Sequence, residues 1–97
     1  MTAVALLEMS IRPDAEGVDD ILRADLPHTA AFPGNQGTEV LADPEDPSKL
    51  WLLTHWADQD ALDTYVAWRN SPEGATRLAE IASGVPMSRH YVTHLTF

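Results

Sequence analysis

The stretch Lys49–Trp68, KLWLLTHWADQDALDTYVAW, decides the fold of this 97-residue chain. It begins as a strand that ends at Trp56 and runs directly into an acidic helix start. A strand with one buried face alternates apolar and polar side chains. Here Leu52 and Trp56 occupy one face while Trp51 and Leu53 occupy the other, so the strand is covered on both sides. Because so short a chain cannot cover its own sheet twice, we expect helices on one face and a second copy of the protein on the other.

Composition limits the class of protein. A chain of 97 residues predicts one domain, 1–97, near the size at which oligomerisation helps stability. The formal charge of -9 argues against nucleic acid or an anionic membrane as partner, since both repel an acidic protein. The absence of cysteine excludes disulfides and thiolate chemistry. The N-terminal apolar run is broken by Glu8, so it predicts a strand rather than a signal peptide or membrane span, and we expect a cytoplasmic protein.

Periodicity and turn residues predict alternating strands and helices. Strands are predicted at 3–11, 36–42, 50–56 and 88–97, and helices at 15–31, 58–70 and 73–83. Asp14 or Asp19 could cap the first helix, and Pro27 would kink or interrupt it. The order is βαββαβ with a further short helix, which is the ferredoxin-like α+β plan: a four-stranded antiparallel sheet with helices on one face. Apolar residues on the other face predict a homodimer that buries two sheets together.

Three short motifs carry a resemblance to a known family. Phe32-Pro33-Gly34 follows the first helix, the acidic segment Asp43–Pro47 joins two strands, and Leu52–Leu62 forms the strand-to-helix corner. In this order they resemble the antibiotic biosynthesis monooxygenase family, whose fold is the dimeric α+β barrel. The resemblance covers the whole chain in element order. It implies oxygenation without a cofactor or metal, in which a deprotonated phenol or enol reacts with dioxygen while the protein excludes water and stabilises the anion.

The resemblance also implies roles in a cavity between sheet and helices. Trp56 matches the family's tryptophan and is either a ring-stacking or anion-binding wall or a core aromatic. Tyr65 lies where many members carry a histidine and could donate to a substrate oxygen, or simply pack. Arg77 lies close to an arginine position of anthrone oxygenases and could pair with a phenolate, or be solvated surface. His28 could be a general base at the cavity mouth, or an exposed histidine favoured by the helix dipole.

The remaining cavity positions are largely apolar. Anthrone oxygenases carry an asparagine four residues before the tryptophan and a tyrosine six residues after it, where this chain has Leu52 and Leu62. Neither leucine can hydrogen-bond a substrate oxygen. On the last strand His90 and Tyr91 lie on opposite faces, so at most one of them lines the cavity, and the sequence does not determine the register that decides which. The residues expected to bind substrate are Leu52, Thr54, Leu62 and Trp68.

These features predict a cofactor-independent monooxygenase that oxidises an aromatic polyketide, phenol or quinol with dioxygen, in secondary metabolism. One alternative is a polyketide cyclase on the same fold, which the missing asparagine and tyrosine favour. Another is a non-catalytic dimer that binds a small molecule. Heme capture, known for relatives with a histidine ligand on the second helix, is a third. Product formation without oxygen separates the first two, because a cyclase works anaerobically.

Overall fold

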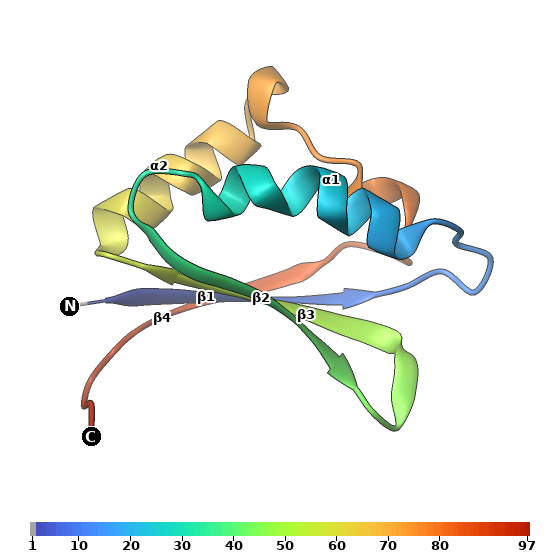
Figure 1. The fold of residues 1–97 in the computed structure, drawn as a ribbon, viewed down its shortest axis with the longest axis horizontal. Helices are drawn as coiled ribbons and strands as arrows, with labels where there is room; N and C mark the ends of the chain where they lie inside the picture. Colours follow the sequence, from blue (N-terminus) through green and yellow to red (C-terminus); the bar gives the residue numbers. More distant parts are fainter. Residues whose placement is uncertain (1) are drawn as a thin grey trace.

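The computed structural model describes residues 2–97 and contains four strands, two α-helices and two 3-10 turns (Figure 1). In chain order these are β1 (Ala3–Ser10), α1 (Val18–Ala30), β2 (Asn35–Asp43), β3 (Asp46–Trp56), α2 (Gln59–Arg69), η1 (Pro72–Gly74), η2 (Leu78–Glu80) and β4 (Met87–Val92). The strands form one antiparallel sheet in the order β2-β3-β1-β4, and both helices lie on the same side of it. The predicted ferredoxin-like α+β fold is confirmed. None of the described helices has the length and apolar character needed to cross a membrane.

The two helices begin in different ways. Asp58 caps α2, because its Oδ1 accepts a hydrogen bond from the backbone N–H of Ala61 at 2.8 Å. Helix α1 instead begins after Gly17, which has a φ of 66° and supplies no side chain. The prediction that Asp14 or Asp19 caps this helix is therefore wrong. Pro27 was expected to kink or interrupt this helix; the interruption is wrong, since α1 continues past Pro27 to Ala30.

The region after α2 differs from the prediction of one helix over 73–83. Ala75 is extended, with φ -60° and ψ 140°, and separates η1 from η2. The backbone N–H of Arg77 then donates to Asp25 Oδ2 on α1 rather than to a helical carbonyl. Tertiary contact has replaced the local hydrogen bonds of a helix. The last strand is also shorter than predicted, because Val92 pairs with Ala3, the first residue of β1.

The two-sided apolar pattern of β3 is confirmed. Leu52, Thr54 and Trp56 are buried beneath the helices, whereas Trp51 and Leu53 on the opposite face are half-buried. Within the described residues, both helices and both 3-10 turns lie on the side of Trp56 (Figure 1). The other face of the sheet is open along much of its length. A homodimer through this face stays a prediction.

Two separate hydrophobic clusters form the core, one toward each end of β1. On β1 itself, Ala3 and Met9 are fully buried, and six residues of strand place them about 20 Å apart at about 3.3 Å per residue. Ala5 and Leu7 between them are only half-buried. The Trp56 cluster consists of Ala3, Trp56 and Leu62, and the Ile81 cluster of Met9, Ile21, Ile81 and Ala82.

Candidate functional site

A cavity of about 670 Å³ lies between the sheet and the helices, in the gap between the two clusters. Cavities of this size hold drug-sized ligands. Its floor is set by the strand register: Ala5 pairs with Thr54 and His90, and Leu7 pairs with Leu52 and Ser88. The walls and roof come from α1, α2 and the segment before β4, and include Leu26, Thr29, Leu62, Tyr65, Val66, Arg69, Leu78 and Val85.

A tyrosine, a threonine and an arginine form one polar network on the cavity wall. Tyr65 Oη lies 2.8 Å from Thr29 Oγ1 and accepts a hydrogen bond from Arg69 Nε, also at 2.8 Å. Arg69 Nη2 donates to Thr29 Oγ1 at 2.6 Å. Tyr65 and Arg69 lie one turn apart on α2 and therefore share a face. Thr29 is buried in the last turn of α1 and brings the second helix into the network.

The network leaves one hydroxyl hydrogen uncommitted. Tyr65 and Thr29 each carry a single O–H hydrogen, and both oxygens accept from Arg69. Only one of the two hydrogens is needed for the bond between the hydroxyls, whichever group donates. Within residues 2–97 the other hydrogen has no assigned acceptor, and both side chains line the cavity. The wall therefore presents one O–H donor to an occupant.

The guanidinium of Arg69 is partly buried and, within residues 2–97, forms no ion pair with an acidic side chain. Its remaining hydrogen bonds go to the carbonyl oxygens of Gly74 and Asp25, both at 3.1 Å. Its central carbon lies 4.6 Å from the centroid of the Trp68 ring. The ion pairs found in residues 2–97 involve other residues. The positive charge of Arg69 is thus available to stabilise negative charge that develops at the hydroxyl pair.

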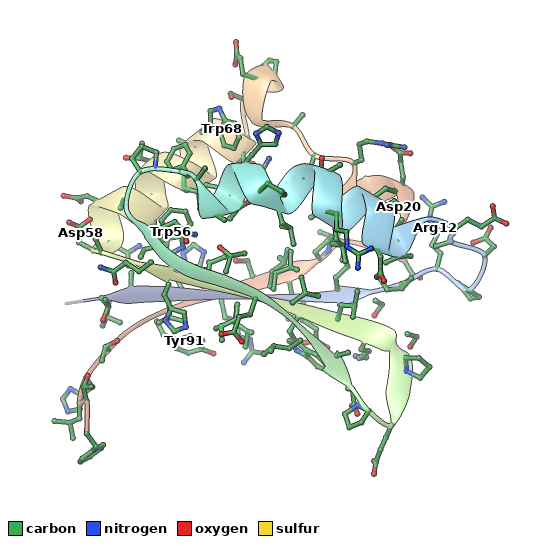
Figure 2. The ribbon with its side chains drawn as sticks, in the orientation of Figure 1. Arg12, Asp20, Trp56, Asp58, Trp68 and Tyr91 are labelled. Atoms are coloured by element: carbon green, nitrogen blue, oxygen red, sulfur yellow. The ribbon has the colours of Figure 1, made fainter. Side chains whose placement is uncertain are left out.

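Trp56 is not among the residues that line the cavity; its side chain lies between the sheet and α2 (Figure 2). Its side chain is 0% exposed, and Nε1 donates to Thr54 Oγ1 at 2.8 Å. The centroid of its ring lies 4.7 Å from the centroid of the Tyr65 ring. The Phe32 ring meets it edge-on, with the two centroids 6.1 Å apart. Of the two interpretations open to the sequence, the core aromatic describes this position. Trp56 fixes the Thr54 hydroxyl and the Tyr65 ring.

The residues expected to bind substrate fall into two groups. Leu52, Thr54 and Leu62 lie on the cavity lining, as their strand and helix positions predict. Trp68 does not: it lies on α2 away from the sheet, with its ring 5.3 Å from that of Phe32 (Figure 2). The indole packs instead against Arg69 and Gly74 of η1, so Trp68 lies outside the cavity lining.

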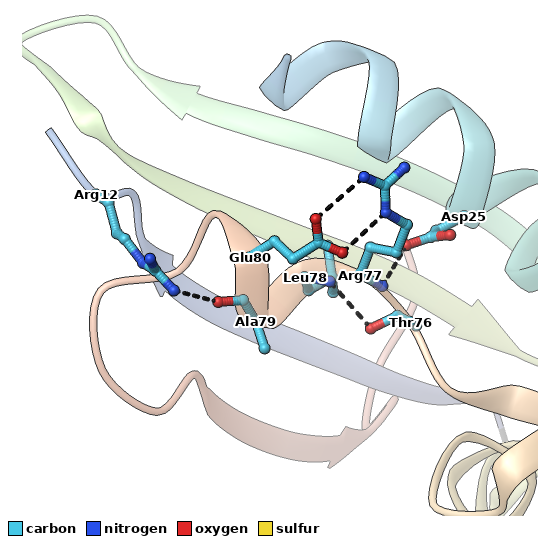
Figure 3. Close-up of polar contacts among 7 residues, drawn as sticks. All are labelled: Arg12, Asp25, Thr76, Arg77, Leu78, Ala79 and Glu80. Atoms are coloured by element: carbon cyan, nitrogen blue, oxygen red, sulfur yellow. Dashed lines mark hydrogen bonds and ion pairs between the residues drawn. The ribbon is translucent and has the colours of Figure 1, made fainter. Parts of the chain in front are cut away.

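Arg77 and His28 also lie outside the cavity lining. The Arg77 guanidinium pairs with Glu80, Nε to Oε2 at 2.9 Å, with both side chains more than half exposed (Figure 3). The hydrogen bond from Arg77 lowers the pKa of the Glu80 carboxyl. His28 is exposed in the last turn of α1. These positions give no contact for the predicted phenolate pairing or for a general base at the cavity.

The register of β4 places His90 on the cavity side. His90 pairs with Ala5, and its Nε2 lies 3.2 Å from Ser88 Oγ. Tyr91 faces the opposite side and is 50% exposed. In the described part of the chain no group of three or more His, Asp or Glu side chains is placed to hold a metal ion. Thr29, Arg69 and Arg12, to which sequence analysis assigned no site role, also line the cavity.

Solved structures share this architecture over nearly the whole chain. Rv0793 from Mycobacterium tuberculosis is 18% identical with a TM-score of 0.79, covering 99% of this chain and 98% of that one. SnoaB, a cofactor-independent oxygenase from Streptomyces nogalater, is 13% identical with a TM-score of 0.80 and coverage of 98% and 95%. A conserved protein from Methanosarcina mazei Go1 is 18% identical with a TM-score of 0.77 and coverage of 94% and 91%. At these identities the likeness concerns the fold.

Sequence comparison supplies the family. The chain matches none of the curated proteins at a significant level. The family model described as antibiotic biosynthesis monooxygenase matches residues 2–76. That range runs from β1 through α2, and it includes the Trp56 corner and the Tyr65–Arg69 turn. The chain belongs to the antibiotic biosynthesis monooxygenase family.

Proposed function

We propose that the protein is a cofactor-independent oxygenase that oxidises a phenol, quinol or aromatic polyketide with dioxygen. The observation that carries this proposal is the uncommitted hydroxyl hydrogen of Tyr65 and Thr29, backed by Arg69, on the wall of a mostly apolar cavity. The apolar surface suits an aromatic ring, and the polar network suits a phenolate oxygen. The similar fold of SnoaB, described as a cofactor-independent oxygenase, supports the same class of activity.

The proposed reaction needs no reductant besides the substrate. The phenolic oxygen accepts the free hydrogen of the Tyr65–Thr29 pair, and the charge of Arg69 stabilises the phenolate. His90, the titratable base on the cavity floor, takes the phenolic proton. The phenolate gives one electron to dioxygen, and the radical pair combines at a ring carbon bearing hydrogen. The resulting peroxide loses water to leave a carbonyl, so phenol and dioxygen give quinone and water.

Other residues hold this arrangement in place. Trp56 acts as a positioning residue, because its ring supports Tyr65 and its indole N–H fixes Thr54. Leu52 and Leu62 supply contact area without hydrogen bonds. Since the polar groups of anthrone oxygenases are absent at these two positions, the hydroxyl pair and Arg69 are the substrate's polar anchor.

Oxygen consumption tests the proposal. The purified protein is given anthrone, naphthols and 1,4-dihydroxynaphthalene without added flavin or metal, and uptake is compared with autoxidation. Tyr65→Phe removes the hydroxyl and keeps the ring, and we expect it to lower turnover by about 100-fold. Tyr91→Phe makes the same change on the outer face of β4 and leaves turnover unchanged. Uptake that never exceeds autoxidation, or equal rates in both variants, contradicts the proposal.

The same network favours one second candidate, a polyketide cyclase. Tyr65, Arg69 and His90 are acid, anion-binding and base groups, and none of them requires oxygen to act on an enolate. Product analysis under strict anaerobic conditions separates the two activities. A cyclised product formed without oxygen supports the cyclase, and dependence on dioxygen supports the oxygenase.

We also propose that two copies pair through the open face of the sheet. Trp51 and Leu53 on β3 are half-buried on this face, and Tyr91 on β4 is 50% exposed there. Large apolar side chains left accessible on one face of a sheet often mark an interface. Light scattering after size-exclusion chromatography should give twice the mass of the chain, and a monomer at micromolar concentration contradicts the pairing.

A further inference from the structure

The charge of the cavity is opposite to that of the chain. The sequence has 15 acidic and 6 basic residues and a formal charge of -9. None of the residues that line the cavity is acidic, yet two arginines, Arg12 and Arg69, line it. A positive hollow in an acidic protein attracts anions locally while the surface as a whole repels them. The cavity is therefore suited to an occupant that carries negative charge.

Arg12 is the arginine with hydrogen-bond donors to spare. It follows β1, and its Nε donates to the carbonyl of Ala82 at 3.0 Å, while Nη2 donates to that of Ala79 at 2.8 Å (Figure 3 shows the second bond). A guanidinium has five N–H groups, so three remain. Within residues 2–97, Arg12 takes part in neither ion pair. Arg12 is both exposed and part of the cavity lining, so its guanidinium lies at the cavity mouth.

Arg69, unlike Arg12, has almost no hydrogen-bond donors left to bind an occupant. Four of its five N–H groups are committed to Tyr65, Thr29 and two backbone carbonyls. It therefore contributes its field and holds the hydroxyls, while Arg12 keeps an open fork of the kind that binds a carboxylate in bidentate fashion. A carboxylate at the mouth also keeps part of its hydration, which lowers the cost of binding it.

The two arginines act at opposite ends of the cavity. Tyr65, the partner of Arg69, packs against the Trp56 cluster, whereas Arg12 bonds to Ala82 of the Ile81 cluster. Figure 2 shows Arg12 and Trp56 toward opposite ends of the molecule. Along β1 the two clusters lie about 20 Å apart at about 3.3 Å per residue. An occupant that reaches both groups is longer than a single ring.

We infer, on the basis of the proposed function, that the substrate is a fused aromatic phenol or quinol with a carboxylate remote from the ring that is oxidised. The carboxylate binds Arg12 at the mouth, and the phenolic oxygen lies at the Tyr65–Thr29 pair. Between them Leu7, Leu52 and Leu78 contact the faces of the rings. Arg12 is then the residue that determines specificity for an acid.

Calorimetric titration with two unreactive probes tests the inference. The probes are 2-naphthoate and its methyl ester, which share the ring system and differ in charge. We expect the acid to bind about tenfold more tightly than the ester. Arg12→Gln should remove this preference and leave ester binding unchanged, and Arg12→Lys, which keeps the charge without the fork, should retain part of it. Arg23→Gln makes the same charge change on the exposed surface of α1 and keeps the full preference.

Each outcome bears on one proposal at a time. Equal binding of acid and ester by the unaltered protein overturns the inference, as does equal loss of acid binding in the Arg12→Gln and Arg23→Gln variants. Oxygen uptake is then measured with 5,8-dihydroxy-2-naphthoate and its methyl ester, in which the carboxyl group lies on the ring that is not oxidised. If the protein prefers the acid, this preference depends on Arg12, and oxygen uptake does not exceed autoxidation, the result supports acid recognition by Arg12 and contradicts the oxygenase activity. If oxygen uptake exceeds autoxidation and kcat/KM is equal for the acid and the ester, the result supports the oxygenase activity and overturns the inference about Arg12.

Discussion

The two ends of the cavity are built by different means. At the Trp56 end, the rings of Phe32, Tyr65 and Trp68 pack with centroid separations of 5.3 to 6.2 Å, and Trp56 is fully buried beneath α2. At the Arg12 end, the chain runs through the short turn η2 and a largely exposed segment, 83–86, to reach β4. Packed aromatic rings hold the first end. At the second end the aliphatic Ile81 cluster packs beneath an exposed segment, and a few hydrogen bonds to backbone carbonyls hold that segment in place.

This difference in packing matches the roles proposed for the two ends, which are positioning of the reacting oxygen at the Trp56 end and access and specificity at the Arg12 end. Segments with few buried contacts open at lower free energy than packed cores, and such segments suit binding and release. The Tyr65 hydroxyl must instead be held in one place to meet a substrate oxygen, which needs a rigid support. We expect the Trp56 end to set the rate and the Arg12 end to set access and specificity.

The largest expected effect is the loss of stability when the Trp56 end is emptied. Trp56→Ala removes a side chain that is 0% exposed and leaves a void between β3 and α2. We expect the free energy of unfolding to fall by about 3–5 kcal/mol, measured by urea denaturation. Val85→Ala at the mouth shortens a side chain that is 91% exposed and costs less than about 0.5 kcal/mol. Equal losses contradict the difference between the ends.

Two glycines with positive φ sharpen the comparison. Gly34, beside the Trp56 end, has φ +90°, and a Cβ there would lie 2.5 Å from Ala61 Cβ. Gly84, at the mouth, has φ +80° and nothing within 4 Å of a Cβ. Both alanine variants carry the cost of the left-handed conformation, about 1 kcal/mol, while Gly34→Ala adds about 1–3 kcal/mol of overpacking.

The difference between these variants isolates packing from backbone conformation. Thermal unfolding should therefore show a larger fall in Tm for Gly34→Ala than for Gly84→Ala. Equal shifts would mean that Ala61 moves aside at little cost and that the packed end is softer than its geometry indicates.

The Trp56 end is also the end that the sequence predicts well. The apolar run of β3 and the cap at Asp58 are local signals, and Leu52, Thr54 and Leu62, which they position, line the cavity. Thr29 is different, because its contact with Tyr65 joins residues 36 positions apart. No sequence pattern near Thr29 indicates this contact. For Arg69, the four-residue spacing from Tyr65 was a usable signal.

The structure of the Arg12 end could not be predicted from the local sequence pattern. Leu78 and Ile81 have helical spacing, yet the helix predicted over 73–83 gives way to two short turns. The contacts that decide the outcome are long-range: Arg77 N–H to Asp25 spans 52 residues, and Arg12 to Ala79 spans 67. Propensity is a weak guide where such contacts compete with helical hydrogen bonds.

Removing the Arg12 hydrogen bonds should loosen the mouth alone. In Arg12→Gln the two bonds to Ala79 and Ala82 are lost or weakened, which costs about 1 kcal/mol and speeds local opening about fivefold to tenfold. Hydrogen exchange at the Ser83 N–H, which donates to Ser10 O, reports on this opening. The Leu62 N–H on α2 serves as the internal control. Equal acceleration at both sites would mean that the two ends unfold as one unit.

The smallest expected effect concerns the ion pair of Arg77 and Glu80 on the outer surface of the Arg12 end (Figure 3). The hydrogen bond from Arg77 lowers the pKa of Glu80. A carboxyl with a lowered folded pKa contributes stability above its unfolded pKa, and this contribution is lost as pH falls through the folded pKa. In Arg77→Gln the pKa of Glu80 should rise toward its ordinary value, as followed by NMR titration of its carboxyl carbon.

The same variant separates the two arginine roles that sequence and structure assign differently. The family resemblance left Arg77 as either a partner for a phenolate or solvated surface. In the structure its guanidinium pairs with Glu80, and Arg12 lines the cavity instead. Arg77→Gln should therefore leave the preference for 2-naphthoate over its ester intact, although it removes the same charge as Arg12→Gln. If both variants lose the preference equally, the attraction for acids comes from net charge near the mouth and not from the fork of Arg12. Loss in Arg77→Gln alone would restore the role that the family resemblance implied.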